Sequence, residues 1–166
     1  WHCIFFQRKT GRPLKSGVDM AIILAEYASG TVAPVYTASD WRTVLYNTIK
    51  KDENGIITSL NTNQITLPPG TYTVFAEAYI FNSGALNARQ RLWNVTDNSD
   101  LFGQGINIRL SADTGTLGGG AAATFTLTEA KTIEHQVYPT ATTGSSGTAV
   151  ANGENEIYSK MIIMKH

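Results

Sequence analysis

Short segments of alternating hydrophobic and polar residues occupy most of the chain, and residues 71–81 form the longest one without a breaker. A turn precedes this segment, because Pro68 and Pro69 fix φ near the turn value and Gly70 accepts a positive φ. The segment itself is rich in β-branched and aromatic side chains, which predicts one long β-strand. We expect the rest of the chain to be organised around this strand.

The two faces of this strand differ from those of a strand with one wet side. One face carries Tyr72 and Val74, and the other carries Phe75, Tyr79 and Phe81. A half-solvated strand alternates apolar and polar residues, whereas this one is largely apolar on both faces. We infer that one face packs on the domain's own core and that the other is covered, with another copy of the same chain as the favoured cover.

Further short strands are predicted between turns that recur every 8 to 12 residues or so. They are expected at residues 31–37, 41–49, 56–60, 64–67, 86–96, 101–110, 122–128, 132–140 and 156–164. Residues 20–27 favour a strand over a helix capped by Asp19. About ten antiparallel strands with this spacing predict an all-β jelly-roll β-sandwich.

Turns and loops complete this pattern. Residues 86–96 are expected to pair back on the long strand as a hairpin, and residues 122–128 are expected to form a second hairpin with 132–140. Residues 114–120 hold four glycines and are predicted to be a flexible loop, as is the Ser/Thr/Gly-rich segment 141–153.

The first 18 residues differ in character from the remainder, because a short apolar tip is followed by a basic, glycine-containing connector. We interpret residues 1–18 as a linker or the end of a preceding stalk. Residues 19–166 are then a single head domain, long enough to bury a substantial core.

Charge and cysteine content exclude several function classes. Lys plus Arg and Asp plus Glu number 13 each, so the formal net charge is zero and no general attraction for nucleic acid or anionic membranes is indicated. No run reaches the roughly 18 apolar residues that a membrane span needs. Cys3 is the only cysteine, which rules out an intrachain disulfide and a thiolate metal cage.

No catalytic or metal-binding motif emerges, so the sequence predicts neither an enzyme nor a cofactor. His2, His135 and His166 lack the spacing of a zinc site, and no Gly-x-Ser-x-Gly occurs. His135 is interpreted as a hydrogen-bonded surface or interface residue. Residues 52–55 and 97–100 carry oxygen ligands that calcium accepts, but ordinary Asn/Asp turns are the favoured interpretation.

Five short motifs follow one another in a fixed order. They are Trp-Arg-Thr at 41–43, Asn-Gln-Ile-Thr-Leu-Pro-Pro-Gly-Thr-Tyr at 63–72, Leu-Trp-Asn-Val-Thr-Asp at 92–97, Phe-Thr-Leu-Thr-Glu-Ala-Lys-Thr-Ile-Glu at 125–134 and Gly-Glu-Asn-Glu-Ile-Tyr at 153–158. This set resembles a domain at the ends of bacteriophage fibre and other virion proteins. Gly70-Thr-Tyr72 also resembles the core motif of tumour-necrosis-factor-like (TNF-like) and complement globular-head jelly rolls, with Val74 in place of the usual phenylalanine.

The resemblance implies a homotrimer whose inner sheets face a threefold axis. Tyr72 and Val74 would then point into the protomer core, and Phe75, Tyr79 and Phe81 would face a neighbour. The first 18 residues match nothing in the family pattern, and the apolar ending of the last strand departs from it.

Glu77 lies on the same face and needs a partner in such an interface, because an unpaired buried charge is costly. The candidate partners of Glu77 are Lys160 on the last strand, and Arg89 or Arg91 on the strand that follows residues 71–81. The equally weighted alternative is that Glu77 lies at an open, watery end of the axis.

The function implied is host attachment from the virion surface, as the head of a tail or head fibre. Three identical sites would gain avidity on a host cell-surface glycan or protein receptor. Tyr36, Trp41 and Tyr138 are candidate ligand-binding residues, although packing explains Trp41 and Tyr138 equally well. Residues 1–18 would connect the head to other virion proteins. The alternatives are a purely structural trimerisation or decoration module, and a secreted lectin-like or signalling head.

Overall fold

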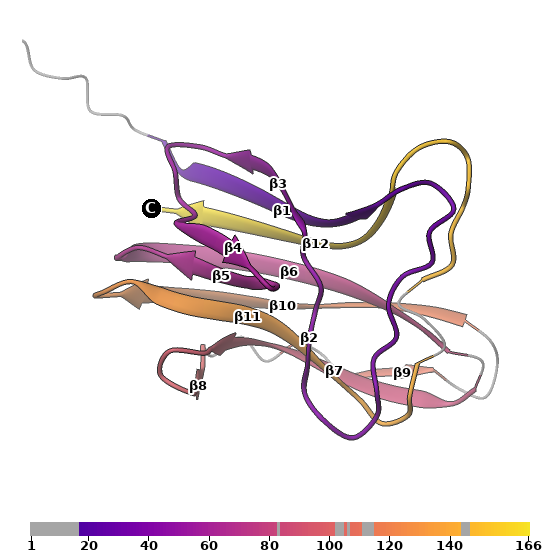
Figure 1. Cartoon of the computed structure of the whole chain (residues 1–166). Coiled ribbons are helices and arrows are strands. Elements are labelled where there is room, and N and C mark those ends of the chain that lie inside the picture. Colours follow the sequence, from indigo (N-terminus) through magenta and orange to yellow (C-terminus); the bar gives the residue numbers. More distant parts are fainter. Residues whose placement is uncertain (1–16, 83, 102–104, 106, 111–114, 144–146) are drawn as a thin grey trace, which may run out of the picture.

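The chain folds into two antiparallel β-sheets stacked face to face (Figure 1). Every regular element in the described part of the chain is a strand, which confirms the predicted all-β class. No helix in that part has the length and apolar character needed to cross a bilayer. The expectation for residues 1–18 falls almost wholly outside the described residues. The computed structural model describes residues 17–82, 84–101, 105, 107–110, 115–143 and 147–166.

The first sheet has five strands in the order β10-β6-β12-β1-β3. Residues 20–27 belong to a strand, as favoured, and that strand pairs with both β12 and β3. β12 lies between β6 and β1, so the two ends of the described chain meet in the middle of this sheet (Figure 1). The strands are β1 (Asp19–Tyr27), β3 (Thr48–Asp52), β6 (Gly70–Asn82), β10 (Gly115–Leu127) and β12 (Glu156–Lys165).

The second sheet has the order β4-β5-β11-β7-β8, with β2 paired to β11 and β9 paired to β7. A two-residue turn joins β4 to β5. Its Thr62 and Asn63 have φ values of 50° and 70°, the left-handed conformation that a tight hairpin requires. The strands are β2 (Arg42–Thr43), β4 (Ser59–Asn61), β5 (Gln64–Leu67), β7 (Leu86–Asn94), β8 (Ser99–Asp100), β9 (Ile108–Leu110) and β11 (Lys131–Pro139).

β6 has the two different faces that its sequence predicts. Tyr72, Val74 and Ile80 are completely buried between the sheets. Phe75 and Tyr79 point outward and are 47% and 43% exposed. An aromatic side chain usually lies inside a folded domain, so the outer face of the first sheet is unusually apolar for a surface.

Two predicted hairpins are wrong. β7 does not pair with β6, and β11 does not pair with β10, because β6 and β10 lie in the first sheet and β7 and β11 lie in the second. β6 pairs instead with β10 and β12, while β7 pairs with β11. Turn residues permit a crossing between sheets as readily as a hairpin, so local sequence does not decide which sheet a strand joins.

Four predicted strands are shorter than expected or absent. Residues 31–37 form no strand, and residues 41–49 contain only β2 and the start of β3. Residues 56–60 contain only the start of β4, and the described strand within 101–110 is β9. The backbone around Tyr36 bonds to another loop instead of a sheet edge. Its N–H donates to Thr143 Oγ1 at 2.8 Å, and its carbonyl accepts from the Thr143 N–H at 2.9 Å.

Residues 115–120 belong to β10, so the prediction of a glycine-rich loop there is wrong. Gly118 lies opposite Tyr79 in the ladder, and a Cβ at Gly118 would lie 2.8 Å from Tyr79 Cε1. A Cβ at Gly120 would lie 2.6 Å from the Ala76 carbonyl oxygen. Glycine in this strand therefore allows close approach of the β6 backbone and the Tyr79 ring, a recognised use of strand glycines.

His135 is fully buried between the sheets, so its interpretation as a surface or interface residue is wrong. Gln90 Nε2 donates to the Ala78 carbonyl, which leaves Gln90 Oε1 to accept from His135 Nε2–H at 2.8 Å. His135 Nδ1 then accepts from the Tyr46 hydroxyl at 2.9 Å. Burial lowers the pKa of His135 from 6.5 to about 3, so the imidazole is neutral in the folded core.

Candidate functional site

The outer face of the first sheet carries a group of side chains that we call the apolar face. In the ladder, Phe75 lies opposite Ile162 and Glu77 lies opposite Lys160. Neighbouring positions on β10 are Gly118, Gly120 and Ala122, which add almost no side-chain bulk. The apolar face consists of Phe75, Glu77, Tyr79, Lys160 and Ile162.

The small residues of β10 leave the apolar face hollowed beside its large side chains. One hollow of about 330 Å³ lies next to Phe75 and Glu77, above Gly120 and Ala122. A second hollow of about 260 Å³ lies between Tyr79 and the glycines of β10. Projecting rings beside hollows give this face the relief that close contact with another surface requires.

Glu77 and Lys160 form the only ion pair of the apolar face in the described structure. Lys160 Nζ lies 3.9 Å from Glu77 Oε2, and the two side chains are 46% and 56% exposed. Arg89 and Arg91 lie on β7 in the second sheet and cannot reach Glu77. Of the three partners that the sequence offers for Glu77, the structure therefore selects Lys160. Phe81 follows on the same side of β6 and is half-buried.

The outer face of the second sheet carries a different group, in which an arginine lies between two tryptophans. The guanidinium carbon of Arg91 is 3.9 Å from the centre of the Trp41 ring and 3.8 Å from that of Trp93. The Tyr138 ring contacts Trp41 edge-on, with centroids 5.5 Å apart. We call Trp41, Arg91, Trp93 and Tyr138 the aromatic–arginine surface.

Hydrogen bonds from neighbouring strands hold the aromatic–arginine surface in place. Arg91 Nε donates to Gln136 Oε1 at 2.8 Å, and Gln136 Nε2 donates to Glu134 Oε2 at 2.6 Å. Glu134 also accepts bonds from Thr43 and Gln64. Partial burial lowers the pKa of Arg91, an effect opposed by nearby carboxylates, and the guanidinium stays charged.

The structure places the three candidate ligand-binding residues in two different environments. Trp41 and Tyr138, far apart in the sequence, are brought together on one surface. Tyr36 is only 5% exposed and belongs to the hydrophobic core, so it is not available to a ligand. Arg91 and Trp93 were not singled out from the sequence as ligand contacts, yet their shared parity on one strand is a readable signal of a common face.

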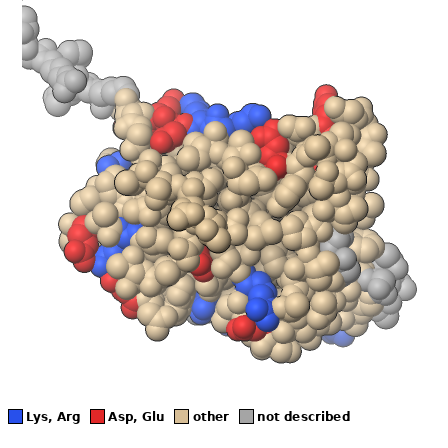
Figure 2. All heavy atoms as spheres, viewed as in Figure 1, with Lys and Arg blue, Asp and Glu red and all other residues tan. Residues whose placement is uncertain are grey.

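Charged residues elsewhere make no catalytic or metal-binding arrangement in the residues that the structure describes, where no group of three or more His, Cys, Asp or Glu gathers. The two Asp-rich turns use their carboxylates internally. Asp97 accepts from Lys131 Nζ at 2.6 Å and from Asn94 Nδ2 at 2.8 Å. Asp52 accepts from the Ile56 N–H at 2.7 Å. Figure 2 shows charges in small groups over a largely uncharged face.

Two stacked antiparallel sheets with this strand order make a jelly-roll β-sandwich of the TNF-like type, the fold that the sequence predicts. The structure is similar to that of murine APRIL, with a TM-score of 0.54 and 10% sequence identity over 90% of this chain and 100% of APRIL. It is also similar to the Eiger TNF of S. frugiperda, with a TM-score of 0.51 and 11% identity over 90% and 92% of the two chains.

The globular domain of zebrafish complement 1qA gives a TM-score of 0.49 at 16% identity over 90% of this chain and 97% of that domain, which is too low to add to the fold assignment. No family model matches the chain. No curated protein matches it either. At these identities the similarity defines the fold alone.

Proposed function

We propose that this domain is the homotrimeric head of a virion appendage, such as a bacteriophage tail or head fibre, and that it attaches the particle to the host surface. The observation that carries the proposal is the apolar face, with Phe75 and Tyr79 nearly half exposed in the single chain. The placement on a virion rests on the five ordered sequence motifs. The TNF-like fold supports an assembly through one sheet without identifying the particle.

Assembly through the apolar face has a direct physical reason. Burial of apolar area is favourable by about 25 cal/mol per Å², and each aromatic side chain contributes a large share of such an interface. The hollows above Gly120 and beside Tyr79 are able to receive side chains of a neighbouring copy. A second and third copy of the chain therefore cover the apolar face without any change of the sheet.

Receptor binding is assigned to the aromatic–arginine surface because it lies on the opposite sheet and stays exposed when the apolar face is covered. Tryptophan, tyrosine and arginine are the residues that dominate binding energy at interfaces. Three copies of this surface on one rigid head would bind a repetitive host glycan or protein receptor with avidity. The proposed binding residues are Trp41, Arg91, Trp93 and Tyr138.

Sedimentation of the purified domain at micromolar concentration tests the assembly, and a stable monomer would contradict it.

Binding of labelled domain to host cells tests attachment. The Trp41→Ala variant should bind cells at least tenfold more weakly, because Arg91 loses one of its two ring contacts and Tyr138 loses its neighbour. Val35→Ala, an exposed loop change, serves as the control. Trimers that bind no host cell would favour the purely structural module.

The Glu77–Lys160 pair provides a test of whether the proposed interface is dry. Lys160→Met should weaken the trimer, since removing one partner of a buried ion pair costs about 3–5 kcal/mol. The double variant Glu77→Leu/Lys160→Met should restore or exceed the original stability, because no charge is then left unpaired. Dissociation measured by ultracentrifugation over a dilution series distinguishes these results. Equal stability of all three proteins would instead place the pair in water, at an open end of the axis.

A further inference from the structure

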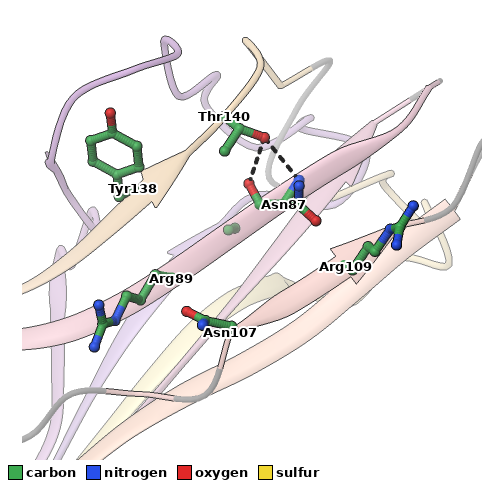
Figure 3. Close-up of a pocket in the computed structure, with 7 residues that line it drawn as sticks. Asn87, Arg89, Asn107, Arg109, Tyr138 and Thr140 are labelled. Carbon is green, nitrogen blue, oxygen red and sulfur yellow. Dashed lines mark hydrogen bonds between the residues drawn. The ribbon is translucent and has the colours of Figure 1, made fainter.

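Next to the aromatic–arginine surface, the outer face of the second sheet contains a pocket lined mainly by residues with polar side chains (Figure 3). Its volume is about 370 Å³, within the range of pockets that hold small ligands. Its lining includes two arginines and no carboxylate. The lining residues are Asn87, Ala88, Arg89, Asn107, Arg109, Tyr138 and Thr140.

The register of the strands explains how these side chains share one face. On β7, Asn87 lies opposite Arg109 of β9, and Arg89 lies opposite Tyr138 of β11. Arg89 and Arg109 are therefore diagonal neighbours across an antiparallel pair, about 7–8 Å apart, within reach of one ligand. Figure 3 shows Asn107 between them, with the two guanidinium groups pointing toward opposite ends of the pocket.

The two arginines differ from every other cation in the part of the chain that the structure describes. The other described lysines and arginines each contact a carboxylate or an aromatic ring. Arg89 and Arg109 make no such contact there, although both side chains are exposed. Ten guanidinium N–H groups are thus available in one pocket of a chain whose net charge is zero.

The rest of the lining suits a sugar. The amides of Asn87 and Asn107 can donate to and accept from hydroxyl groups. Thr140 Oγ1 is engaged with the Asn87 backbone, at 2.9 Å from its N–H and 3.0 Å from its carbonyl, and so fixes the wall between β7 and β11. The Tyr138 ring, held by Trp41, offers an apolar surface for the C–H groups of a pyranose ring.

We infer that this pocket binds an acidic saccharide, with anionic carboxylate or phosphate groups of the sugar paired with Arg89 at one end and Arg109 at the other. The inference rests on the proposed function, because it names the ligand class of the receptor-binding sheet. Guanidinium groups pair with carboxylate and phosphate through parallel hydrogen bonds, and these charge-assisted bonds are roughly twice as strong as neutral ones. A neutral sugar would leave both cations without a partner.

The test uses the full chain on an immobilised panel of saccharides that carry uronic acid, sialic acid or phosphate, each beside its neutral counterpart with the carboxyl reduced or the phosphate removed. We expect binding to at least one acidic saccharide and at least tenfold weaker binding to its neutral counterpart. Arg89→Gln and Arg109→Gln should each weaken that binding about tenfold, the usual effect of losing one charged hydrogen bond. The carboxylate and phosphate arms show which anion is preferred.

Lys50→Gln is the matched control, because Lys50 is an exposed cation on the first sheet whose loss should leave saccharide binding unchanged. Thermal unfolding of each variant verifies the fold. Equal binding of acidic and neutral saccharides, indifference to both arginine changes, or equal binding of a polyglutamate peptide would each overturn the inference. Loss of host-cell binding in Trp41→Ala but not in the arginine variants would overturn it while leaving the proposed function intact. Absence of any host-cell binding, with saccharide binding retained, would overturn the proposed function and leave this inference intact.

Discussion

The free energy of unfolding should fall as the pH is lowered from 6.5, because His135 is neutral in the core and takes up a proton only when the chain unfolds. Its pKa is 6.5 in an open chain and about 3 in the folded protein. The unfolded state therefore binds more protons between these values, and stability is lost steadily on acidification. The loss is about 1.4 kcal/mol per pH unit between these values, or roughly 3 kcal/mol by pH 4.5 and about 4 kcal/mol by pH 3.

Carboxylates do not obscure this effect in the upper part of the range. Glu26 and Glu156 have pKa values below the ordinary 4.5, chiefly because of hydrogen bonds from Asn155 and from the Ala151 N–H respectively. Their contribution is fully present above pH 4.5 and is lost only as the pH falls further. Between pH 6.5 and 4.5 the slope consequently reports the buried imidazole.

Urea unfolding at several pH values measures this slope in the protein and in two variants. His135→Gln should be less stable at neutral pH but should lose the slope above pH 4.5, because glutamine does not titrate. His166→Gln is the control and should keep the slope, since His166 is exposed and its ring bonds to the exposed Thr73 Oγ1. A His135→Gln protein with an unchanged slope would show that another group titrates.

Phe75→Asp should convert the proposed trimer into a folded monomer. Each copy would place a carboxylate without a partner in the interface, at a cost of several kcal/mol, and every 1.4 kcal/mol weakens assembly about tenfold. The monomer itself should unfold at nearly the same temperature, because Phe75 is already 47% exposed in the single chain. Light scattering at micromolar concentration gives the mass, and thermal unfolding by circular dichroism checks the fold.

Val35→Asp is the control for that experiment, since it adds the same charge at a residue that is 52% exposed in a loop outside the apolar face. It should remain trimeric. A trimeric Phe75→Asp protein would exclude the apolar face as the interface, and the aggregation of both variants would point to misfolding rather than to dissociation.

The strand content could be predicted from the sequence more fully than the pairing. Alternation of side chains correctly separated the buried Tyr72 and Val74 from the exposed Phe75 and Tyr79. Partner strands were not predictable in the same way, because the two expected hairpins depend on turns that also allow a crossing between sheets. The glycines of β10 are typical of a loop in the sequence, whereas in the structure the ring of Tyr79 packs over Gly118 and leaves no room for a side chain there.

In the candidate sites too, the face on which a residue lies could be predicted more fully than its neighbours on other strands. Lys160 was one of three partners that the sequence offered for Glu77, and the register of β12 against β6 is what places it opposite Glu77. The pocket of Arg89 and Arg109 could not be found from the sequence, because β9 is only three residues long and its register is set by distant pairing. The burial of His135 could not be predicted either, because its core partners Tyr46 and Gln90 come from two separate segments.

The central position of β12 has a consequence for synthesis of the protein. β6 and β1 each need β12 as a neighbour, so the first sheet cannot close until residues 156–165 have left the ribosome. Until then, both strands present unpaired edges, and the apolar face has no continuous surface on which another copy can dock. Emergence of residues 156–165 therefore has to precede any assembly through the apolar face.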